Sequence, residues 1–125
     1  MVDEYVNHRP MAHDERLDLA FAALAHPTRR AAVELLRRGP RCAGELADEL
    51  GFAPAGLSRH LRVLRESGLI GEAAAEEDGR MRLLHLERAP FDELRGWIED
   101  VQAFWTDQLA SFKAHAEGRR KPGRR

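Results

Sequence analysis

Three short segments with apolar residues every three or four positions fill residues 15–51, and they constrain the fold most. They run over residues 15–24, from Pro27 to Gly39, and over residues 42–51. This spacing places apolar side chains on one face of a helix, while proline in the first turn and glycine just past the end are usual helix boundaries. Because 125 residues suffice for one compact domain, we expect the three amphipathic helices to share one core.

The segment LSRHLRVLRESGLI, residues 57–70, predicts a fourth helix with two chemically different sides. On a helical wheel its leucines form one stripe, and its arginines lie mainly on the opposite side. Like charges four positions apart cost a few tenths of a kcal/mol, so an inert surface helix usually mixes charges of both signs. This helix carries three arginines and one glutamate, which indicates a surface that meets something negatively charged.

The pattern changes beyond Gly68 to a hairpin and one long helix. Residues 69–87 predict a β-hairpin, with Asp78 and Gly79 supplying the turn. From Pro90 onward, about 27 residues of helical spacing predict a helix of roughly 40 Å. That is longer than one domain of this size needs to cover its core, so we expect the same helix of a second chain to cover its apolar stripe. The predicted dimer interface comprises Leu17, Phe21, Leu94, Ile98, Val101, Trp105, Leu109 and Phe112.

Together these elements predict a mainly α fold with a small β-hairpin, a winged helix-turn-helix that dimerises through its first and last helices. Residues 1–13 show no periodicity and are expected to form a flexible arm ahead of the domain at 14–118. The last seven residues, 119–125, contain five of the twenty basic residues and no acidic one. We expect them to form a disordered basic tail.

Four stretches resemble the ArsR/SmtB family of small bacterial winged-helix repressors, over roughly residues 14–116. They are LAHPTRRAAVELL, AGELADELG, LSRHLRVLRESGLI and EDGRMRLLHL, of which the third is the most specific. The resemblance implies a cytoplasmic homodimer that represses transcription. It would dock two recognition helices into successive major grooves of a palindromic operator in double-stranded DNA.

The residues expected to contact DNA lie on the recognition helix and on the hairpin. Small residues at the helix start let the backbone approach base edges, a serine can donate a hydrogen bond, and arginines can bind guanine or phosphate. Hairpin arginines can reach phosphates or the minor groove. The predicted set is Ala55, Gly56, Ser58, Arg59, His60, Arg62, Arg65, Arg80 and Arg82.

Three of the basic positions have a structural alternative. His60 lies beside the leucine stripe, so we expect a packed or capping role as readily as a DNA contact. Arg29 and Arg30 can meet phosphate, or Arg30 can pair with Glu34 four residues on.

The metal motifs implied by the resemblance are interrupted in this chain. The thiolate motif needs two cysteines separated by one residue, whereas Cys42 is followed by Gly44 in the second position. In the last helix, Asp100 is followed by Gln102 where an Asp-x-His motif needs histidine. We therefore expect no metal site and no cofactor. One alternative is a metal- or thiol-sensing repressor that combines Cys42 with His8 or His13.

Composition excludes several other classes. A single cysteine excludes an intrachain disulfide framework, and we expect neither a membrane span nor a secretory signal, which favours the cytoplasm. No nucleophile, base and orienting group can be assembled, so an enzyme is not expected. The remaining alternative is a winged helix used only for protein contacts. No residue pattern points to an effector.

Overall fold

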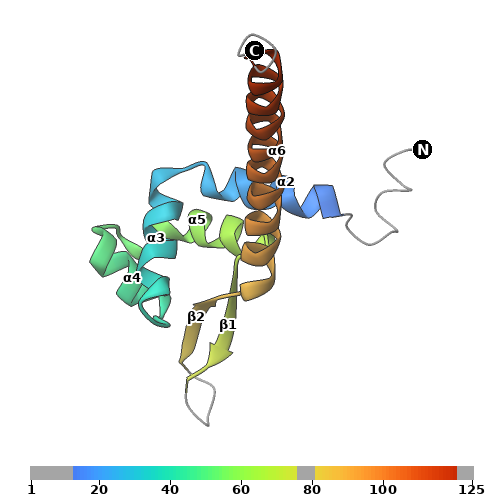
Figure 1. Ribbon diagram of the computed structural model, residues 1–125. Coiled ribbons are helices and arrows are strands. Elements are labelled where there is room, and N and C mark those ends of the chain that lie inside the picture. The colour runs from blue at the N-terminus through green and yellow to red at the C-terminus, as the bar shows by residue number, and fades with distance from the viewer. Residues whose placement is uncertain (1–12, 76–80, 121–125) are drawn as a thin grey trace, which may run out of the picture. The chain divides into compact units, whose positions relative to one another are not determined.

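The computed structural model describes residues 13–75 and 81–120, which form five helices and one β-hairpin. They divide into two compact units, one reaching to Phe91 and one beginning at Asp92. The elements, labelled in Figure 1, are α2 (His13–Leu24), α3 (Pro27–Arg37), α4 (Ala43–Leu50), α5 (Pro54–Glu66), β1 (Ile70–Ala74), β2 (Arg82–Leu86) and α6 (Arg88–Arg120). Residues 1–12 of the predicted arm, the hairpin turn with Arg80, and residues 121–125 of the predicted tail lie outside the described residues. His13, the last residue of the predicted arm, is the first residue of α2.

Local signals set the helix boundaries of the first unit. α3 begins at Pro27, and His26 caps it, because the backbone N–H of Thr28 donates to Nδ1 of His26 over 3.1 Å. α4 ends at Gly51, whose φ of +77° is a left-handed conformation that favours glycine. These ends agree with the prediction from proline and glycine placement.

Two helices begin earlier than the sequence predicts. α5 begins at Pro54, ahead of the segment at residues 57–70 that predicts it. α6 begins at Arg88, two residues ahead of Pro90, and has 33 residues where about 27 were expected. Proline is tolerated at both positions because the first N–H groups of a helix lack an intrahelical acceptor. α6 also continues to Arg120, past the boundary predicted for the tail.

Every element of the first unit contributes to its core, which consists of leucines, alanines and one isoleucine. Its largest fully buried side chains are Leu46, Leu57, Leu64, Leu69 and Leu84. The leucine stripe predicted for α5 is confirmed, because Leu57, Leu61 and Leu64 are 1%, 3% and 0% exposed. Burial of this stripe fixes which side of α5 faces solvent.

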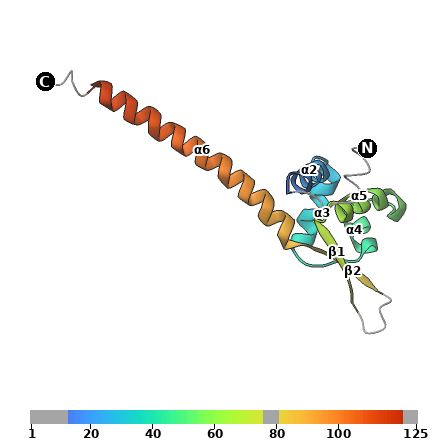
Figure 2. The same cartoon turned by 90° about the vertical axis from the view of Figure 1, so that its right-hand side faces the viewer.

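The two strands pair antiparallel, with Ile70 opposite Leu86 and Ala74 opposite Arg82. The hairpin projects from the packed helices in both Figure 1 and Figure 2. Arg41, ahead of α4, adds an isolated antiparallel bridge to Leu84. Helices α4 and α5 with this hairpin form the predicted winged helix-turn-helix, in which α5 is the recognition helix and β1–β2 the wing.

The second unit consists of the rest of α6, one continuous helix in Figure 2. Its large apolar side chains are exposed along most of its length: Trp97, Ile98, Phe104, Trp105, Leu109 and Phe112. Despite these residues, none of the described helices has the length and apolar character that a membrane span requires.

Candidate nucleic-acid interface

The exposed side of the recognition helix carries most of the predicted contact residues. Opposite the buried leucines, Ser58, Arg59, Arg62 and Arg65 are all exposed. Ala55 and Gly56 are exposed in the first turn, and their small side chains keep the backbone there accessible. One face of α5 therefore combines an open helix start with three guanidinium groups.

The three arginines of this face are not engaged with other described residues. Among the described residues, Arg59, Arg62 and Arg65 form neither an ion pair nor a side-chain hydrogen bond. A guanidinium carries five N–H donors in a planar fork that matches phosphate or the acceptor edge of guanine. The face is thus equipped to bind an anionic surface without first breaking internal contacts.

The wing supplies one predicted contact that the structure describes. Arg82 is exposed at the first position of β2, directly opposite Ala74 of β1. Met81 beside it is 46% exposed. Arg80, the second predicted wing contact, lies in the turn outside the described residues, so its role stays a prediction.

His60 lies at the inner edge of the recognition helix, and its contacts fit the structural alternative. It is half-buried, and its Nδ1 lies 3.2 Å from Nη1 of Arg29. Its ring centroid is 4.4 Å from that of His26 and 6.5 Å from that of Phe52. Burial lowers the pKa of His60, and its closeness to His26, Arg29 and Arg59 lowers it further.

The neighbouring arginines of α3 bind the end of α2. Arg29 donates from Nε to the carbonyl of Ala23 over 2.6 Å and from Nη2 to that of Ala22 over 3.2 Å. Arg30 donates from Nη1 to the carbonyl of Leu24 over 2.8 Å. The last carbonyls of a helix lack intrahelical donors, and these guanidinium groups supply them.

The expected ion pair between Arg30 and Glu34 is wrong. Glu34 instead accepts from Nη2 of Arg37 over 2.9 Å, one helical turn along α3. Both partners are well exposed, so this pair adds little to stability. Arg30 instead donates to the carbonyl of Leu24, because the carbonyls at a helix end have no intrahelical donor.

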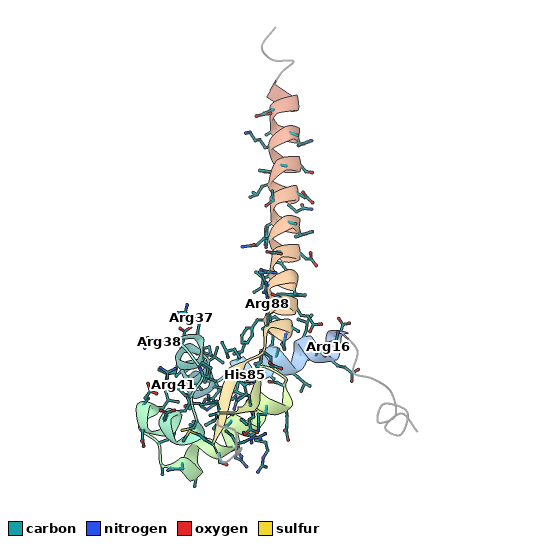
Figure 3. All side chains as sticks on the ribbon, turned by 90° about the horizontal axis from the view of Figure 1, so that it is seen from below. Arg16, Arg37, Arg38, Arg41, His85 and Arg88 are labelled. Atoms are coloured by element: carbon teal, nitrogen blue, oxygen red, sulfur yellow. The ribbon has the colours of Figure 1, made fainter. Side chains whose placement is uncertain are left out.

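Sequence reasoning missed Arg41, which joins three elements. Its Nε donates to Glu49 of α4 over 2.7 Å, and its Nη1 donates to Gly39 over 2.9 Å and to the carbonyl of Leu35 at the end of α3. Its backbone exchanges hydrogen bonds with Leu84 of the wing. Figure 3 labels Arg41 together with Arg37 and Arg38. A single arginine in a short loop leaves no periodic signal, so these contacts were not predictable.

Comparison with known proteins identifies the family. Residues 26–71, which span α3 to the first residues of the wing, match the model of bacterial regulatory proteins of the arsR family. The HTH-type transcriptional regulator Rv2034 of Mycobacterium tuberculosis (strain ATCC 25618 / H37Rv) is 38% identical over 95 residues, 76% of this chain and 83% of the relative. The chain belongs to the ArsR family. It is a transcriptional regulator of the winged helix-turn-helix type, as the sequence predicted.

Solved structures agree with this family assignment. The crystal structure of the ArsR family transcriptional regulator RHA00566 is 35% identical, covers 74% of this chain and 98% of its own, and has a TM-score of 0.65. The NMR structure of the homodimeric winged helix-turn-helix DNA-binding domain of Mb0332 from Mycobacterium bovis is 23% identical, with a TM-score of 0.54. It covers 76% of this chain and 82% of its own, and at that identity it shows a shared fold.

Cys42 lies at the start of α4 in this ArsR-family chain. It is half-buried at the N-cap of α4, and its backbone N–H donates to Oε1 of Glu45 over 3.0 Å. That hydrogen bond is the main reason why the pKa of Glu45 is lowered. Gly44 has no described atom within 4 Å of where a Cβ would lie, so packing does not require glycine there.

The described residues contain no group of three or more histidine, cysteine or acidic side chains arranged to hold a metal ion. His8 and the side chain of His13 lie outside the described part of the chain. The composite site of Cys42 with these histidines therefore stays an untested alternative.

The predicted dimer residues divide by exposure. Leu17 and Leu94 are each 6% exposed, so they are already covered within one chain. Val101 is half-buried. The others are exposed: Phe21, Ile98, Trp105, Leu109 and Phe112. Trp97 and Phe104, which lie beside the predicted stripe, are 47% and 57% exposed and enlarge this apolar surface.

Proposed function

We propose that the chain is a homodimeric repressor that binds a palindromic operator in double-stranded DNA through α5. One observation carries the proposal: three exposed arginines without a described partner lie opposite the buried leucine stripe. The leucines hold α5 to the core, so its arginine face is presented as a fixed surface. A recognition helix of this kind enters the major groove and contacts base edges with its N-terminal residues.

Each residue on that face has a distinct proposed role. Arg59 and Arg62 bind guanine or the adjoining phosphates, and Ser58 donates to a base or a phosphate. Arg65 lies later on the helix and contacts the phosphate backbone. The small residues Ala55 and Gly56 allow the helix start to approach the bases. Arg80 and Arg82 of the wing contact phosphates or the minor groove.

The proposed dimer accounts for the exposed apolar residues of α6. An apolar stripe of this length on a monomer calls for a partner, and a second copy of the same stripe is self-complementary under twofold symmetry. The homodimeric Mb0332 domain, which shares the fold, supports this choice. Two recognition helices related by a twofold axis require two half-sites, which makes the operator palindromic.

The proposed regulator works without a bound metal or a reaction of its own, and it acts in the cytoplasm, where the operator is found. The interruption of the thiolate pair at Gly44 and of the second motif at Gln102 supports metal-independent binding.

Fluorescence anisotropy with the full chain tests the proposal. The probe is a labelled duplex from the region upstream of the chain's own gene, and the control is a duplex of the same composition in scrambled order. We expect tighter binding to the upstream duplex at every salt concentration. The affinity should fall with salt at a logarithmic slope of about −5 to −7, because roughly six to eight phosphates are neutralised per dimer. Equal affinity for both duplexes, or no binding, would contradict it.

A further inference from the structure

His60 connects the recognition helix to the rest of the domain through a single arginine. The guanidinium of Arg29 donates to Ala22 and Ala23 at the end of α2 and also reaches Nδ1 of His60 on α5. The ring of His26, at the cap of α3, lies beside that of His60 with 4.4 Å between centroids. Three helices therefore meet at Arg29, His26 and His60, which we call the histidine brace.

The hydrogen bonds of the brace require uncharged rings. An arginine has only donors, so Nδ1 of His60 must be unprotonated to accept from Nη1 of Arg29. Nδ1 of His26 likewise accepts from the backbone N–H of Thr28. A proton on either Nδ1 would set two donors against each other, and it would place a second positive charge beside Arg29.

The charged groups around His60 all oppose its protonation. They are His26 and Arg29 on the side of α3 and Arg59 on α5 itself, while Phe52 covers the ring edge from the loop after α4. Burial and these charges lower the pKa of His60 below its ordinary value of 6.5. A lowered pKa in the folded state stabilises the fold above pH 6.5, and this stabilisation is lost as the pH falls through the folded-state value.

We propose that the histidine brace positions the recognition helix for DNA, and that protonation of His60 releases the helix from α2 and weakens binding. This inference rests on the proposed function of α5. The leucine stripe still holds α5 to the core when the brace opens, so the fold persists while the angle of the arginine face changes.

The sign of the pH effect distinguishes this inference from simple electrostatics. A histidine that merely gained a positive charge close to DNA would tighten binding as the pH falls, because it adds attraction to phosphate. Loss of the brace predicts the opposite. Binding linked to the release of one proton weakens by at most tenfold per pH unit below the pKa. Because the pKa of His60 lies below 6.5, we expect a loss of less than about tenfold between pH 7.5 and 5.5, and most of it at the acidic end.

The test measures anisotropy of the full chain with the upstream duplex from pH 7.5 to 5.5 at constant ionic strength. His26→Asn keeps a side chain that caps α3 but removes the neighbouring imidazole. It should shift the midpoint of the affinity loss to higher pH, because His26 no longer lowers the pKa of His60. Arg29→Lys keeps the charge, but its single nitrogen cannot bind both carbonyls of α2 and Nδ1 of His60. It should bind at pH 7.5 as weakly as the wild type does at pH 5.5.

His85→Asn is the matched control, since it removes another half-buried imidazole. His85 lies on β2, and its Nδ1 is 3.4 Å from Oε1 of Glu87. Its pH profile should superimpose on that of the wild type. Wild-type binding that is constant or tighter at low pH would overturn the inference. An unshifted midpoint in His26→Asn would also overturn it. Neither result depends on whether Arg29→Lys folds. Absence of specific binding at pH 7.5 would instead refute the proposed function, and the inference would fall with it.

Discussion

Helices α5 and α6 are both amphipathic, but their apolar sides meet different surroundings. In α5, Leu57, Leu61 and Leu64 are at most 3% exposed, because the domain covers them. In α6, Trp105, Leu109 and Phe112 are 61%, 65% and 74% exposed. The difference teaches that the same sequence pattern can serve two purposes. A covered stripe orients a polar face toward a ligand, whereas an uncovered stripe is itself a binding surface.

The largest expected effect comes from breaking the covered stripe. Leu61→Ala should lower the free energy of unfolding by about 2 to 5 kcal/mol, because it leaves a cavity in a closed core. Leu109→Ala on α6 is the matched control, since it removes the same atoms from an exposed position. Denaturant unfolding at a protein concentration low enough to keep the chain monomeric should show little change for Leu109→Ala. A similar loss in both variants would contradict the distinction between the two helices.

The next effect concerns the uncovered stripe. Trp105→Ala should weaken dimerisation by about 2 to 4 kcal/mol, because large aromatic residues at the centre of an interface carry much of its binding energy. Sedimentation equilibrium at micromolar concentration should give twice 14.1 kDa for the wild type and a lower average mass for the variant. Asp107→Ala on the same helix is a control that leaves the apolar stripe intact. A wild-type chain that is monomeric at that concentration would refute the dimer.

The smallest effect is expected from metals. Zinc, cadmium or arsenite at stoichiometric concentration should leave the affinity for the upstream duplex unchanged, because Cys42 has no second thiol at Gly44. Gly44→Cys restores the spacing of the thiolate pair and should make binding sensitive to the soft metals. If any of the three metals lowers the affinity of the wild type for the upstream duplex by more than tenfold, the chain has a metal site. The alternative with N-terminal histidines would then gain support.

The fold was largely predictable, because it depends on patterns that repeat along the chain. The leucine spacing of α5 and the glycine that ends α4 are both visible in the sequence. The bonds that position the site are different in kind. Arg29 and His60 are 31 residues apart, and Arg41 binds carbonyls and one carboxylate. Such contacts join single side chains across the fold, so neither periodicity nor local propensity reveals them.

Helix ends were predicted less well than helix faces. The sequence predicts that the last helix begins at Pro90, but α6 begins at Arg88 and includes the proline in its first turn. Several positions in that turn tolerate proline equally, because their N–H groups have no intrahelical acceptor. A proline therefore marks the beginning of a helix to within a turn.

The most direct test of the account is the DNA affinity of a variant that lacks both Arg59 and Arg62. Each single change, Arg59→Ala or Arg62→Ala, should weaken binding to the upstream duplex by about 1 to 3 kcal/mol and leave the thermal midpoint nearly unchanged. We expect the double variant to be a folded dimer that no longer distinguishes the upstream duplex from the scrambled one in fluorescence anisotropy. Wild-type affinity and preference in that folded double variant would show that the arginine face of α5 is only a solvated helix surface.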